Sequence, residues 1–169
     1  MQSNMTASAM KYGFILGVFF SLNFLFSITN NAVMAFLSNL LFAFSIILAY
    51  RFAIRFRELE NNGIISYGRA LSYVLLLFLF ASIISGSVVL VYSRFINPTF
   101  LVGLNETMRH TLEGLTIVQG VTKEQIDESL NLLLSPTMYA FQYIWGNTFL
   151  GLIAGLIMAF FVKKQSTDT

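Results

Sequence analysis

The chain has 169 residues, of which 56% are hydrophobic and only 11% are charged. Typical soluble domains carry about 25% charged residues, so this composition excludes an ordinary soluble fold. The absence of cysteine excludes disulfides and thiolate metal sites, and the net charge of +2 is too small to indicate a nucleic-acid partner.

Charged residues are absent from three long stretches, residues 12–50, 70–93 and 129–162. A helix needs roughly 20 apolar residues to cross a hydrocarbon core about 30 Å thick, so each stretch is long enough to span a membrane. The first stretch would form a helix of about 58 Å, nearly twice that thickness, and therefore has to fold back. We expect the turn at residues 29–31, Thr-Asn-Asn, because these side chains compete for backbone hydrogen bonds.

The predicted fold class is an all-α membrane protein with four transmembrane helices, organised as one domain over residues 1–169. Pro136 lacks an N–H group and disfavours helix before it, so the last span should begin just after it. A cleaved signal peptide is the alternative for the first span, but its apolar run exceeds the usual length of about 7–15 residues. The predicted spans are residues 12–28, 32–50, 70–93 and 137–162, with an extracytoplasmic helical segment at 94–135.

The orientation follows from basic residues near the span ends, which remain in the cytoplasm. Seven of the ten basic residues lie on the side that holds both termini, so both termini are expected to be cytoplasmic. These seven are Lys11, Arg51, Arg55, Arg57, Arg69, Lys163 and Lys164; the opposite side has Arg94, Arg109 and Lys123.

The segment at 94–135 is expected to contain two helices. Thr122 followed by Gln125 forms a capping-box pattern that predicts a short amphipathic helix at 122–135, after an earlier helix at about 99–115. We favour a role in which these helices cover the membrane boundary or the end of the bundle. The alternative is that they bind a ligand or a partner. The predicted apolar face holds Ile126, Leu130, Leu133 and Leu134.

Small residues at four-residue spacing indicate close helix packing in two spans. The first pattern is Gly13 with Gly17, and the second is Gly151, Gly155 and Ala159. Each face contacts either a neighbouring span or a second copy of the chain, and we favour the neighbouring span.

Three intramembrane asparagines, Asn23, Asn39 and Asn147, need hydrogen-bond partners in hydrocarbon. We favour their use as ties between helices over a path for a polar solute. A proton or ion path normally requires an ionisable residue at depth, and the predicted spans contain none.

No catalytic, cofactor or metal site is expected. His110 is the single histidine, and Glu106 and Glu113 share its helical face, which we interpret as a surface charge cluster. Phosphate-binding glycine loops and hydrolase motifs are absent from the sequence. We therefore expect that the protein is not an enzyme.

Arginines alternate with aromatic residues in the segment 51–60, a pattern typical of the lipid headgroup layer. A cytoplasmic docking site is the alternative. Gly63 is expected to end the helix that continues from the second span, and Gly68 to let the chain turn into the third.

The segments 63–71 (GIISYGRAL), 92–98 (YSRFINP) and 161–164 (FVKK) are similar to those of a widespread bacterial family of small four-span inner-membrane proteins, classed as a domain of unknown function. The resemblance implies a bacterial inner-membrane protein. It implies no activity, cofactor or catalytic residue.

Two functions are consistent with these patterns. The first is a non-enzymatic scaffold or accessory subunit, with the lipid bilayer and a membrane protein or a second copy as partners. The alternative is a small transporter or channel for a weakly polar or lipid-like solute, with the three asparagines along its path.

Overall fold

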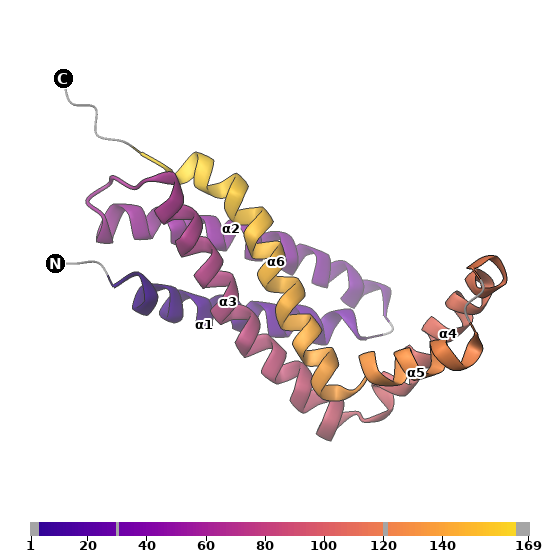
Figure 1. Ribbon diagram of the computed structural model, residues 1–169. Helices are drawn as coiled ribbons and strands as arrows, with labels where there is room; N and C mark the ends of the chain where they lie inside the picture. Colours follow the sequence, from indigo (N-terminus) through magenta and orange to yellow (C-terminus); the bar gives the residue numbers. More distant parts are fainter. Residues whose placement is uncertain (1–3, 30, 120–121, 165–169) are drawn as a thin grey trace. The chain divides into compact units, whose positions relative to one another are not determined.

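The structure is a computed structural model that describes the backbone of residues 4–29, 31–119 and 122–164, and the side chains of all of these except 113–119. These described residues form helices and contain no β-strand. The helices are α1 (Met5–Ser27), α2 (Ala32–Glu60), α3 (Tyr67–Val91), α4 (Thr99–Gln119), α5 (Lys123–Leu133) and α6 (Pro136–Val162), with a short π-helix η1 (Tyr92–Ile96) after α3 (Figure 1).

Four helices are long and apolar enough to cross a membrane: α1, α2, α3 continued by η1, and α6. The predicted fold class, an all-α protein with four transmembrane helices, is therefore confirmed, and the chain is a multi-pass membrane protein. The helices extend beyond the predicted spans, which were drawn from the apolar stretches alone. Outside those stretches, capping side chains and backbone hydrogen bonds are enough to continue a helix.

Polar side chains set the starts of three helices. Asn4 caps α1, with its Oδ1 atom accepting a hydrogen bond from the Ala7 N–H at 3.2 Å, so α1 begins before the predicted span. Asn31 caps α2 by accepting from the Val33 N–H at 2.9 Å. Thr122 and Gln125 form the predicted capping box at the start of α5, which is confirmed.

The connection between α2 and α3 reverses through two residues with positive φ, Asn62 at 52° and Gly63 at 77°. Glycine adopts this conformation without the steric cost that a side chain would add. Gly68 is not part of the reversal, because it lies in the first turn of α3 and its φ is not positive. The expectation that Gly68 turns the chain is therefore wrong.

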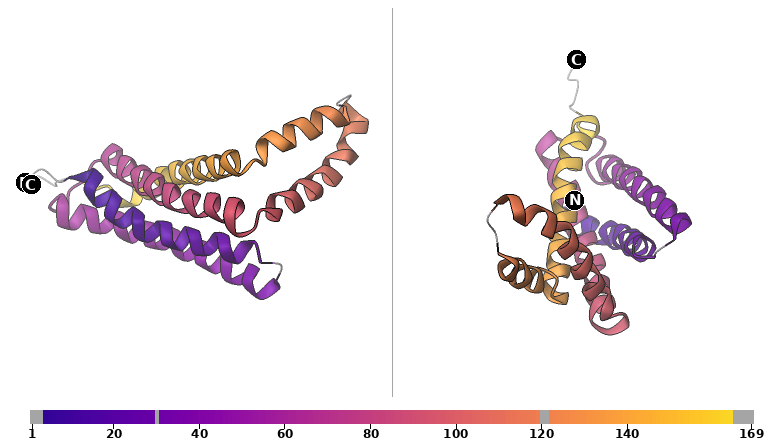
Figure 2. Two further views of the ribbon diagram at one scale, coloured as in Figure 1. Left: turned by 90° about the horizontal axis from the view of Figure 1, so that it is seen from below. Right: turned by 90° about the vertical axis from the view of Figure 1, so that its right-hand side faces the viewer.

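The chain forms two compact units. The first contains the described residues up to Ser85 together with those from Ile144 onward, and the second contains residues 86–143. In the first unit, α1 and α2 lie side by side as an antiparallel hairpin (Figures 1 and 2). Its core centres on α3, whose completely buried side chains include Tyr73, Val74, Leu77, Phe78 and Ala81.

The second unit contains the hairpin of α4 and α5. Arg109 on α4 forms an ion pair with Asp127 on α5 at 2.9 Å, and the Asn105 amide donates to the Asn131 Oδ1 atom at 3.2 Å. Leu130, on the predicted apolar face of α5, is buried. Leu133, from the same predicted face, is 45% exposed.

Candidate functional site

Gly13 and Gly17 allow α1 to lie directly against α3. A Cβ atom at Gly13 would be 2.8 Å from Phe80 Cβ and 3.0 Å from the Leu77 carbonyl oxygen. At Gly17 it would be 2.8 Å from Ile84 Cβ. Both positions contact a span of the same chain, which leaves no room on this face for a second copy.

The second small-residue face, on α6, also packs against α3. A Cβ atom at Gly151 would overlap the Phe78 side chain, whereas one at Gly155 would first meet Leu71 Cδ1, at 3.0 Å. Ala159, the third residue of the pattern, is completely buried. α3 is therefore the helix on which both glycine faces converge.

The three asparagines lie in different environments. The Asn23 amide donates to the Ser38 carbonyl oxygen and so ties α1 to α2. The Asn39 amide is exposed and donates to the Ala35 carbonyl oxygen of its own helix at 3.0 Å. Asn147 is partly buried on α6. These hydrogen bonds of Asn23 and Asn39 therefore stabilise the helices, and the two side chains do not line a shared path.

A hydroxyl pair ties α3 to α6. Ser82 Oγ and Thr148 Oγ1 are 3.0 Å apart, so one hydroxyl donates to the other, and the accepting hydroxyl donates its own proton to a carbonyl of its own helix. No feature of the sequence identified Ser82 and Thr148 as partners. Such bonds are common links between transmembrane helices.

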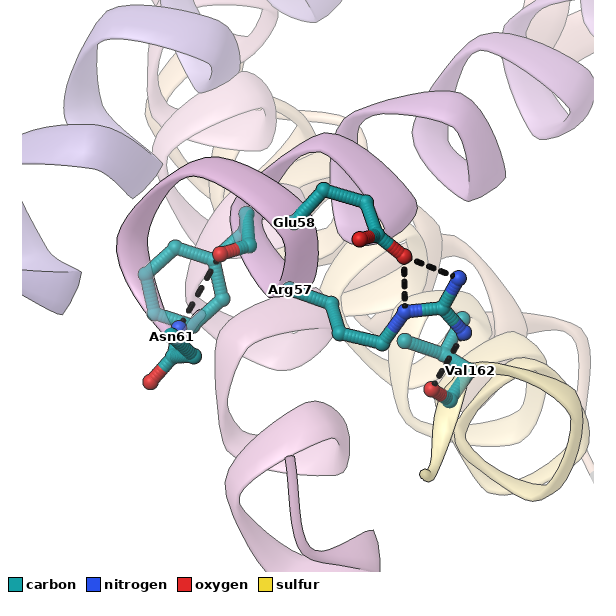
Figure 3. A network of polar contacts seen from close by, with 5 residues as sticks. Arg57, Glu58, Asn61 and Val162 are labelled. Carbon is teal, nitrogen blue, oxygen red and sulfur yellow. Dashed lines mark hydrogen bonds and ion pairs between the residues drawn. The ribbon is translucent and has the colours of Figure 1, made fainter. Parts of the chain in front are cut away.

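The ends of α2 and α6 are joined by a polar cluster that we call the α2–α6 clamp, formed by Arg57, Glu58, Ile65, Val162 and Lys164. Arg57 donates to the Val162 carbonyl oxygen at 3.0 Å and pairs with Glu58 at 2.6 Å (Figure 3). Ile65 and Lys164 exchange two backbone hydrogen bonds, both of 3.0 Å. The carbonyls at a helix C-terminus have no partner inside the helix and carry partial negative charge, so a guanidinium group stabilises the end of α6.

Two cations lie near one tyrosine ring at this end of the first unit. Lys11 Nζ is 5.6 Å and Arg55 Cζ is 5.7 Å from the centroid of the Tyr12 ring. The ring of Phe52 packs beside Tyr12, with centroids 4.6 Å apart. Lys11 belongs to α1 and Arg55 to α2, so the packing of the two helices brings the charges together.

In the second unit, a cavity of about 200 Å³ lies between α4 and α5. Its lining is mainly apolar, with two amide side chains, and the residues are Pro98, Leu101, Val102, Asn105, Asn131, Leu134 and Pro136.

His110 and Glu106 lie on α4, whereas the Glu113 side chain lies outside the described residues. Among the residues that the structure describes, no group of three His, Cys, Asp or Glu side chains is arranged to hold a metal ion.

The sequence matches the family model described as "Protein of unknown function (DUF4199)" over residues 11–164. No curated protein and no solved structure matches the chain. The matched range includes all four spans and the hairpin of α4 and α5, and it agrees with the resemblance read from the sequence. The chain therefore belongs to the DUF4199 family of proteins of unknown function.

Proposed function

We propose that the protein is a non-enzymatic scaffold or accessory subunit of a bacterial inner membrane, with both termini in the cytoplasm. The observation that carries the proposal is the packing around α3. Leu77 and Phe78 are completely buried there, and glycines on α1 and α6 bring the backbones of these two helices into contact with α3. A helix packed in this way on two neighbours provides rigid support.

The outward faces of α2 and α6 support the same proposal. α2 exposes Phe36 by 62% and Ile47 by 59%, and α6 exposes Trp145 by 67% and Ile157 by 60%. These faces are available to lipid and to partner helices. Association between helices in lipid depends on such packing contacts, because the bilayer supplies no hydrophobic drive of its own.

Site-specific photocrosslinking in native membranes tests the proposal. A photoreactive residue at Ile47 or Ile157 should capture a distinct membrane protein, whereas one at the buried Leu77 should capture no other protein and serves as the matched control. Capture of lipid alone from every outward position of α2 and α6 would contradict a scaffold function.

The alternative, a transporter for a lipid-like solute, is favoured by one feature. An apolar cavity of about 220 Å³ lies between α3 and α6, lined by Leu75, Trp145, Thr148, Phe149 and Leu152. None of the three asparagines lines this cavity, so it does not coincide with the asparagine-lined path considered from the sequence. Protein-dependent movement of a labelled lipid in proteoliposomes, abolished by Leu152→Trp, would support the alternative over the scaffold.

A further inference from the structure

The Lys11, Tyr12 and Arg55 cluster combines features that point to an anionic ligand. Both cations lie within 6 Å of one ring centroid, so two like charges share one aromatic side chain. Like charges at short range repel each other, and the ring compensates only in part through cation–π attraction. An anion between them would convert the repulsion into two charge-assisted contacts.

The protein itself supplies no such anion among the residues that the structure describes. The ion pair at this end of α2 joins Arg57 to Glu58, and neither Lys11 nor Arg55 has a carboxylate within 4.0 Å. Both side chains belong to exposed residues. The cluster is therefore accessible from outside, and neither cation is held in an ion pair with a described residue.

The position along the helices identifies the source of the anion. Tyr12 begins the charge-free part of α1 and Tyr50 ends that of α2, so hydrocarbon ends close to this level. Arg55 is five residues beyond Tyr50, about 7 Å at 1.5 Å per residue, and the headgroup layer of a bilayer is of similar thickness. The charges therefore lie at the depth of lipid phosphates. Exposed Met10 and Phe14 beside the cluster offer apolar contacts for acyl chains.

We propose that Lys11, Tyr12 and Arg55 form a binding site for the phosphate-bearing headgroup of one acidic phospholipid. The Arg55 guanidinium binds two phosphate oxygens through its planar fork, and the Lys11 ammonium contributes a point charge. The Tyr12 ring lies close to both cations, and the Phe52 ring packs against it. This site is independent of the scaffold function and requires only that the helices cross a membrane.

Native mass spectrometry of the detergent-purified protein with added phosphatidylglycerol tests the site. The Lys11→Gln, Arg55→Gln double variant should bind the lipid about tenfold more weakly than the wild type, because it removes both cations that contact the one phosphate. The matched control is Lys163→Gln with Lys164→Gln, which removes the same charge. Lys163 Nζ lies 4.4 Å from the centroid of the Phe160 ring, which no second described cation approaches, and we expect less than a twofold change.

Two further measurements distinguish an organised lipid site from nonspecific attraction to positive charge and from a site for free phosphate. Tyr12→Leu keeps both cations but removes the ring, and it should also weaken lipid binding, by about threefold. Inorganic phosphate at 10 mM, roughly the concentration of a buffer, should neither displace the lipid nor raise the melting temperature as bound lipid does. Equal losses in the two double variants, full binding by Tyr12→Leu, or displacement by phosphate would each overturn the proposal. A thermal melt without lipid confirms that each variant is folded.

Discussion

Replacing Gly151 with alanine probes the contact between α6 and α3 most sharply. The added methyl group would overlap the Phe78 side chain, which is completely buried and cannot move aside without disturbing α3. Overpacking of this kind costs about 1–3 kcal/mol. Alanine also favours a helix over glycine by about 0.5–1 kcal/mol, which offsets part of the cost.

A second glycine of the same helix removes that ambiguity. Gly146 has no atom within 4 Å of the position its Cβ would take, so Gly146→Ala gains the helix preference without a clash. The difference between the two variants is then the packing cost alone, about 1–3 kcal/mol. Gly155→Ala should lie between them, because its nearest neighbour is the flexible end of Leu71, at 3.0 Å.

Thermal unfolding in one detergent measures this difference. For a chain of this length 1 kcal/mol corresponds to about 2–4 °C, so Gly151→Ala should melt roughly 3–10 °C below Gly146→Ala. Equal melting temperatures for the two variants would show that α6 does not pack on α3 through Gly151, and the reasoning would be refuted.

Five further substitutions test other contacts by the same unfolding assay. Asn23→Leu should lose about 0.6–1.7 kcal/mol because it removes the tie to α2, whereas Asn39→Leu should be neutral or stabilising; the reverse order would contradict the assigned roles. Arg57→Gln should lose about 1.5 kcal/mol, since the Val162 carbonyl loses a charged donor, and an unchanged melting temperature would show that the α2–α6 clamp is not stabilising. Glu124→Lys should stay within about 0.5 kcal/mol, and Asp127→Lys should lose about 0.2–1 kcal/mol with its partly exposed ion pair; a loss of function in either variant at full stability would instead make α5 a recognition surface.

The sequence predicted the features that depend on local chemistry. Spans without charge follow directly from the cost of burying charge in hydrocarbon, and the capping box of Thr122 and Gln125 follows from hydrogen bonds three residues apart. The glycine spacing predicted a packing face. It gave no information about the partner, because which helix meets Gly151 depends on the arrangement of all four spans.

Contacts between distant residues were beyond sequence reasoning for the same reason. The hydrogen bond from Arg57 to Val162 joins residues 105 positions apart, and Lys11 and Arg55 meet only because α1 and α2 pair in one register. Helix ends were also missed at α1, where Asn4 extends the helix by capping it before the apolar residues begin. Gly68 was misjudged because a reversal by Asn62 and Gly63 made it unnecessary.

The proposed function requires four spans that place both termini in the cytoplasm, and a topology reporter tests this directly. An enzyme that is active only outside the cytoplasm, fused after Val162, should give no signal. The same enzyme inserted at Gly103 in α4, where the structure leaves open space around the glycine, should be active. Activity of the fusion after Val162 would contradict either the number of spans or their orientation.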